Sequence, residues 1–147
     1  GRANNIHPTN KQAVGHRLAL WALGTTYKKV ILYSGPVFSS AKFTRATQVS
    51  PGGGSVSLDH VGLGLKTSDG GKVFTGFAIA GEDRVFCPAK ASYQATARKV
   101  FVYSDHVQNP VAVRYNWADN PSGNLVNSAG LPAAPFRTDS WEIVADK

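Results

Sequence analysis

The pattern of hydrophobic positions changes its period near residue 30. Upstream of that point, apolar residues recur at helical spacing, as Val14, Leu18 and Trp21. This spacing predicts one helix over residues 8–23. Pro8 suits the first helical position, where its missing N–H would be unpaired anyway, and Gly24 suits the C-terminal cap. We therefore expect a single helix at the start of the chain, with an apolar stripe that needs a surface to pack on.

Downstream of residue 30 the apolar residues alternate with a period of two, which is typical of strands. The segments with this pattern are Val30–Ser34, Ala41–Val49, Val56–Asp59, Phe77–Ala80, Val85–Ala91, Lys99–Ser104 and Pro110–Asn116. Turn signals rich in glycine separate them, at residues 51–54, 68–71 and 81–83. About seven short strands in about 90 residues predict a mainly β chain, an antiparallel β-sandwich of the immunoglobulin-like or jelly-roll type.

The last segment, residues 117–141, shows little periodicity but contains three prolines and several large apolar residues: Trp117, Leu125, Leu131, Phe136 and Trp141. A long loop with so many apolar anchors is expected to pack against a surface. We predict an ordered, anchored loop, in which Asn120, Asn124 and Asn127 supply turn hydrogen bonds. A salt bridge between Arg137 and Asp139 is expected to pin its end.

Composition and charge narrow the class of protein. The 147 residues, 42% of them hydrophobic, are enough for one core of ordinary size. The net charge of +7 lies entirely in residues 1–58, which hold seven Lys or Arg and no acid. These bases are dispersed, with no run longer than Lys28-Lys29 and no RNA-binding aromatic motif. We therefore expect no nucleic-acid partner; a segment parted from an acidic neighbouring domain would show the same imbalance.

Other features of the sequence exclude kinds of site or partner but do not assign a function. One cysteine rules out an internal disulfide, and no apolar stretch approaches the roughly 18 residues of a membrane span. His60 and His106 each follow an aspartate, but adjacent strand residues point to opposite faces, so adjacency makes no metal site. We expect no metal, no cofactor and no membrane partner. Gly1 in place of Met suggests a processed or excised N-terminus.

Three stretches carry a resemblance to a known family: residues 5–12 (NIHPTNKQ), residues 111–121 (VAVRYNWADNP), and residues 124–127 running into 130–139 (NLVN, then GLPAAPFRTD). In this order they resemble the C-terminal part of sialate O-acetylesterases and related carbohydrate esterases of the SGNH-hydrolase superfamily. The resemblance covers nearly the whole chain, and the last stretch is the most specific.

The resemblance implies a division of the chain and a role for one histidine. Residues 1–28 correspond to the last helix of an α/β catalytic domain, preceded by its general base, which maps onto His7. Residues 29–147 correspond to an accessory β-sandwich. The implied activity of the parent enzyme is removal of O-acetyl groups from sialic acid or other glycans, with the parent secreted or periplasmic. The partner is then the missing N-terminal catalytic region or a companion chain, and a homo-oligomer is the other way to cover the helix.

Two departures from the family bear on activity. The superfamily often carries Asp three residues before the histidine, where this chain has Asn4. Asn4 or Asn5 can orient an imidazole, but an Asp-to-Asn change in a serine-protease triad costs about 10⁴ in rate. The chain also contains no Gly-Asp-Ser motif, so it lacks the family's nucleophile. We expect it to be inactive alone, as the end of an enzyme whose serine lies elsewhere.

Each candidate residue also has a structural interpretation. His7 is either the catalytic base or a histidine that caps the helix. Arg114, Trp117 and Asn120 form either a sugar-binding face, because aromatic rings stack on pyranoses and Arg or Asn bond their hydroxyls, or part of the framework. In the second case Trp117 belongs to the core and Arg114 pairs with Asp119. The competing function is accordingly a non-catalytic β-sandwich that binds glycan or stabilises a neighbouring domain.

Overall fold

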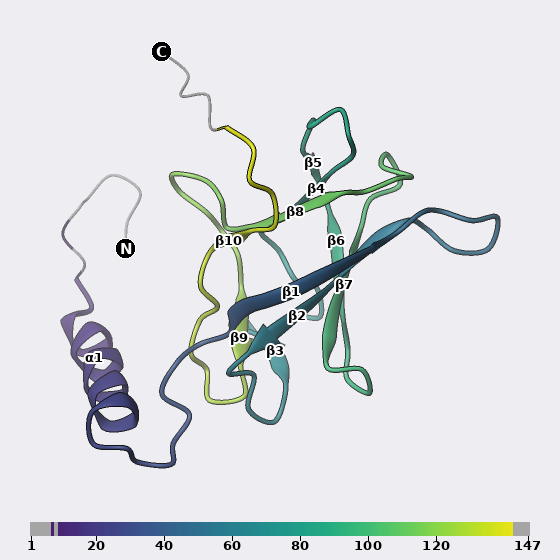
Figure 1. Cartoon of the computed structure of the whole chain (residues 1–147). Helices are drawn as coiled ribbons and strands as arrows, with labels where there is room; N and C mark the ends of the chain where they lie inside the picture. Colours follow the sequence, from purple (N-terminus) through teal and green to yellow (C-terminus); the bar gives the residue numbers. More distant parts are fainter. Residues whose placement is uncertain (1–6, 8, 143–147) are drawn as a thin grey trace.

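The computed structural model describes residue 7 and residues 9–142, and within this part the chain forms one helix followed by ten strands. In chain order these are α1 (Lys11–Thr25), β1 (Val37–Thr44), β2 (Gly53–Asp59), β3 (Leu65–Thr67), β4 (Phe77–Ala80), β5 (Cys87–Pro88), β6 (Lys90–Gln94), β7 (Lys99–Tyr103), β8 (Ala112–Tyr115), β9 (Leu125–Asn127) and β10 (Phe136–Arg137). Figure 1 shows the helix beside a body of strands.

The strands form two four-stranded sheets, in the orders β1-β2-β7-β6 and β10-β8-β4-β5, and one two-stranded sheet, β3-β9. Every strand pair within the described residues is antiparallel. The two larger sheets enclose a core whose most buried members are Val56, Ile79, Val100, Val102, Val113, Tyr115 and Leu125. The structure thus confirms the predicted mainly β fold, an antiparallel sandwich preceded by one helix.

The glycine run at residues 51–54 is not the turn that its composition predicts. Gly53 and Gly54 begin β2 and are buried within the sheet. A Cβ at Gly53 would collide with the ring of Phe101, and one at Gly54 would lie 2.9 Å from the ring of Phe43. These glycines therefore make room for aromatic rings that lie across the strand, one on each face of the sheet.

Three predicted strands also differ from the structure. The one expected over residues 41–49 is β1, which begins at Val37 and ends at Thr44. Residues 30–34 form no strand, because Lys28 turns the chain with a φ of 54° and the ring of Tyr33 packs against other rings instead. The predicted strand over residues 85–91 is split into β5 and β6, which belong to different sheets. Pro88 has no N–H for a sheet ladder, and the chain crosses from one sheet to the other directly after it.

The C-terminal segment packs on the sandwich from Asn124 onward, and it contains two short strands that the sequence pattern does not reveal. Leu125, Leu131 and Phe136 are buried, whereas Trp141 is half-buried. The buried side chain of Asn127 donates to the carbonyl oxygens of Ser34 and His60, both at 2.9 Å. Hydrogen bonds that reach this far along the chain fasten the segment to the sandwich.

Helix α1 starts later and ends later than the sequence predicts. Asn10 is its N-cap and accepts a hydrogen bond from the Ala13 N–H at 3.0 Å; Pro8 lies outside the described residues. Gly24 is inside the last turn rather than at the cap, and a Cβ there would collide with the ring of Tyr33. Gly24 is therefore the point where the helix backbone approaches the rest of the molecule.

The apolar stripe of α1 faces solvent. No residue of the helix is buried, and Leu18 and Trp21 are 68% and 54% exposed. The ring contacts that join the helix to the sandwich run from Trp21 to Tyr33, edge to face at 5.3 Å, and from Tyr33 to His60 at 5.1 Å. No helix in the described part of the chain is long and apolar enough to cross a membrane.

Candidate functional site

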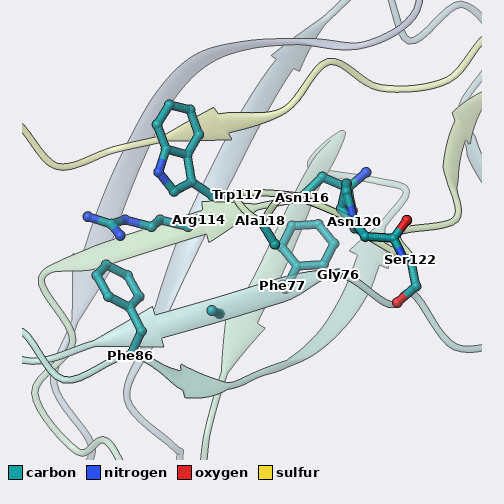
Figure 2. Close-up of a pocket in the computed structure, with 11 residues that line it drawn as sticks. Gly76, Phe77, Phe86, Arg114, Asn116, Trp117, Ala118, Asn120 and Ser122 are labelled. Atoms are coloured by element: carbon teal, nitrogen blue, oxygen red, sulfur yellow. The ribbon is translucent and has the colours of Figure 1, made fainter. Parts of the chain in front are cut away.

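A cleft of about 300 Å³ opens at the end of β8, between the start of β4 and the loop that follows β8. Figure 2 shows its side chains: Arg114 lies beside Phe86, Trp117 stands near them, Phe77 lies at the centre, and Asn120 and Ser122 are at the far end. The sequence-predicted residues Arg114, Trp117 and Asn120 therefore line one cleft. No single stretch of sequence makes the site, because Phe77 comes from β4 and Phe86 from the loop directly before β5.

Arg114 is fixed by an ion pair with Asp139. Its Nε and Nη2 donate to the two carboxylate oxygens of Asp139 at 2.9 and 2.8 Å, the two-pronged geometry that suits a guanidinium. The side chain of Asp139 is only 1% exposed. These hydrogen bonds hold the pKa of the Asp139 carboxyl below its usual range and raise the pKa of the guanidinium. Asp119, the partner that the sequence suggested, is exposed and does not pair with Arg114.

An aromatic ring lies against this ion pair. The Arg114 guanidinium lies 4.0 Å from the centre of the Phe86 ring, and Phe86 packs on Trp141 at 5.7 Å. Arg137 is 3.8 Å from Asp139, so the predicted pair exists but is the weaker of the two. A guanidinium held by a carboxylate on one side and a ring on another has little freedom to rotate. Arg114 thus forms a rigid wall of the cleft.

The loop after β8 is closed by one asparagine. Asn116 has a φ of 50°, a left-handed conformation that asparagine tolerates better than most residues. Its Oδ1 accepts a hydrogen bond from the Gly123 N–H at 2.8 Å, and its own N–H donates to Gly76 at 2.9 Å. A Cβ at Gly76 would lie 2.6 Å from Asn116 Oδ1, and one at Gly123 would collide with the same amide. Glycine at positions 76 and 123 therefore leaves the room that the Asn116 side chain needs.

Trp117 follows Asn116 and is 44% exposed, so it is not a core residue. Its ring is contacted by Arg137, whose guanidinium carbon lies 5.4 Å from the ring centre. Arg137 is itself held by a hydrogen bond from its Nη1 to the Trp141 carbonyl at 3.0 Å. Trp117 is therefore an exposed ring on a braced support, an arrangement that suits stacking on a ligand better than it suits core packing.

The chemistry of the cleft favours binding over catalysis. The described residues that line it offer aromatic rings, two amides, a hydroxyl and a neutralised guanidinium, but no histidine, cysteine or carboxylate. They therefore provide stacking surfaces and hydrogen bonds, and no base among the described lining residues could activate the Ser122 hydroxyl as a nucleophile.

The proposed general base lies in another part of the molecule. His7 is exposed, upstream of α1, and does not belong to the residues that line the cleft. Asn4 and Asn5, its suggested orienting residues, lie outside the described residues. The sequence-predicted site residues thus fall into two groups, the cleft residues that the fold assembles and a histidine that precedes the helix.

Several residues of the cleft were missed by reasoning from sequence. Phe86 and Phe77 read as ordinary strand residues, and nothing local ties them to residue 114. Asp139 was assigned to Arg137 because the two are close in sequence. The unusual Asn116-Trp117 pair after a strand, with glycines at 76 and 123, is the signal that could have identified the closed loop.

Comparisons with known proteins give a match among solved structures. No protein-family model and no curated protein matches the chain. Among solved structures, it is similar to a novel carbohydrate acetylesterase from Xanthomonas citri, with 44% sequence identity and a TM-score of 0.86. The match covers 96% of this chain and 31% of that one, so the chain spans about a third of the length of the acetylesterase it resembles.

Proposed function

We propose that this chain is the C-terminal portion of a carbohydrate esterase that removes O-acetyl groups from sialic acid or related glycans. The observation that carries the proposal is the likeness to a carbohydrate acetylesterase at 44% identity along nearly the whole chain. The nucleophilic serine and the oxyanion hole belong to a catalytic region outside these residues. In this division residues 1–28 complete the catalytic domain, and residues 29–147 form the accessory sandwich.

His7 is the general base of the proposed reaction. The serine hydroxyl attacks the acetyl carbonyl carbon while His7 takes its proton, and the tetrahedral intermediate collapses to an acetyl-serine. His7 returns the proton to the sugar oxygen, which leaves as a hydroxyl. A water molecule then attacks the acetyl-serine and gives one proton to His7, which passes it to the serine oxygen as acetic acid leaves; the acid then loses its remaining proton to solvent and becomes acetate. No metal or cofactor takes part.

The exposed apolar stripe of α1 supports the assignment of residues 1–28 to the catalytic domain. A helix that leaves Leu18 and Trp21 in solvent lacks the burial that normally stabilises short helices, and exposed apolar surface of this kind marks an interface. The catalytic domain is the partner that would cover it, which would bring the end of the helix nearest His7 against the active site.

The cleft supports a second role for the sandwich, glycan binding without hydrolysis. Arg114, Trp117 and Asn120 line one cleft beside aromatic rings, and this role is compatible with the first. It becomes the sole function if no catalytic region accompanies the chain.

A chimera separates these alternatives. The chain alone should hydrolyse p-nitrophenyl acetate no faster than buffer. The same chain should support turnover when it replaces its matching segment in the Xanthomonas citri acetylesterase. Turnover by the isolated chain would mean that it holds a nucleophile of its own. A folded chimera that binds glycan but does not hydrolyse esters would leave only the binding role.

A further inference from the structure

Trp117 lines two hollows that share part of their walls. One is the cleft described above; the other is a second hollow of about 410 Å³. Residues 116–118 line both, and Asp119 and Pro135 complete the second. The two hollows therefore adjoin along this short segment, which carries the exposed ring of Trp117; together we call them the groove.

The ring of Trp117 is held in place before any ligand arrives. Asn116 fixes the backbone through its bond to Gly123, and Arg137 contacts the ring from the side of β10. Arg137 is in turn held by Asp139 and the Trp141 carbonyl. A pre-ordered aromatic side chain loses little conformational entropy on binding, so more of the stacking energy appears as affinity.

The groove suits a carbohydrate chain better than other polymers. A sugar ring has an apolar face and a polar edge, and each hollow pairs a share of one aromatic ring with polar groups, namely Asn120 and Ser122 in the first and Asp119 in the second. A protein partner would have to bury about 800 Å² per partner around apolar anchors to form a stable interface. A nucleic acid needs unpaired cations, whereas Arg114 is neutralised by Asp139 and Asp119 adds a negative charge.

We propose that the two hollows are adjoining subsites, so that the sandwich binds a glycan of at least two sugar units across Trp117. The choice of ligand class rests on the proposed function; the division into two subsites rests on the groove. The consequence is that the module recognises oligosaccharides or polysaccharides rather than an isolated terminal sugar.

Affinity as a function of chain length tests this directly. The 147-residue chain is titrated by calorimetry with β-1,4-linked gluco-, xylo- and manno-oligosaccharides of one to five units and with sialyllactose, each with and without O-acetyl groups. In at least one series, affinity should rise about tenfold or more between one unit and three. Equal affinity for all lengths, or binding of none of the probes, would overturn the proposal.

Three variants assign the effect to the ring and its support. Trp117→Ala should reduce affinity for the longer oligosaccharides about tenfold and bring it close to that for a single unit. Gly123→Ala keeps the ring but sets a Cβ against the Asn116 amide, so it should weaken the same oligosaccharides. Trp21→Ala removes a similarly exposed ring on α1 and should leave the affinity for oligosaccharides unchanged. Thermal melts confirm that each variant is folded. Unchanged affinity of Trp117→Ala for the longer oligosaccharides would contradict the two-subsite model.

Two separate readouts distinguish this inference from the proposed function. p-Nitrophenyl acetate is too small to span the groove, so its hydrolysis by the chimera tests the esterase proposal, whereas the length dependence of saccharide binding tests the groove. Absence of hydrolysis with length-dependent binding intact would end the esterase proposal and leave the groove. Preferred binding of a single-stranded oligonucleotide over every saccharide would overturn the groove's assignment to carbohydrate.

Discussion

The sandwich and helix α1 differ in how far they bury their apolar residues. The sandwich buries Val56, Ile79, Val100 and Val113 completely, whereas α1 buries none of its residues and touches the sandwich through the rings of Trp21 and Tyr33. The sandwich is stabilised by its own core. The helix has a stripe suited to packing, and nothing in the described part of the chain buries it.

The largest effect should come from the sandwich, at Phe136. Its ring is buried and lies against Phe38 at 5.1 Å, Tyr115 at 5.8 Å and Phe77 at 6.4 Å. Phe136→Ala should lower the free energy of unfolding by about 3–5 kcal/mol, because the cavity cannot close among so many rings. Urea denaturation measures this. A loss below about 1 kcal/mol would mean that the C-terminal segment is not part of the core.

Breaking the ion pair should be the next largest effect. Arg114→Ala leaves the Asp139 carboxylate buried with only the longer contact to Arg137, and removing one partner of a buried pair costs about 3 kcal/mol or more. Arg98→Ala, an exposed arginine that donates to the Gly62 carbonyl, is a matched control with an expected loss of about 1 kcal/mol. Equal losses in the two variants would show that the buried pair adds no stability.

The pH dependence of stability follows from the same pair. Because the folded-state pKa of Asp139 is depressed, its contribution is fully present above the unfolded value of about 3.9 and is lost as the pH falls through the folded value. Stability of the wild type should therefore decrease below about pH 4, with a shallower decrease in Asp139→Asn. Urea midpoints between pH 2 and pH 7 measure the difference, and parallel curves for the two proteins would contradict it.

The smallest effect should come from the helix of the isolated chain. Leu18→Ala removes an apolar side chain that is already in solvent, so the free energy of unfolding should change by less than about 0.5 kcal/mol. In the chimera the same substitution should cost about 2 kcal/mol or more, because the side chain is then buried. A large loss in the isolated chain, together with a dimer in sedimentation, would mean that a second copy covers the stripe.

The sequence predicts the sandwich because alternating strands such as Phe77–Ala80 and Lys99–Tyr103 carry their own signal. It misses β3, β9 and β10, which are two or three residues long and exist only through partners distant in the chain. It places Gly53 in a turn because glycine usually marks turns, whereas here the ring of Phe101 requires it. Local patterns thus identify elements, but not the tertiary contacts that override local preference.

The candidate site shows the same difference between what local sequence patterns indicate and what tertiary contacts determine. Arg114, Trp117 and Asn120 were identifiable because they cluster around the end of one strand. The partner of Arg114 was not, because Asp119 and Asp139 are equally plausible until β10 pairs with β8 and brings the later residue alongside. Phe86 enters the cleft only through the pairing of β4 with β5, which no local motif reports.

The most direct test of the central claim measures acetyl ester hydrolysis by the chimera with and without its histidines. His7→Ala should reduce kcat by about 10³ or more with little change in KM, because the serine loses its base. His16→Ala, an exposed histidine on α1, should retain full activity and serves as the control. A His7→Ala chimera that is folded and hydrolyses acetyl esters at the parental rate would contradict the assignment of this chain as the part of the esterase that carries its general base.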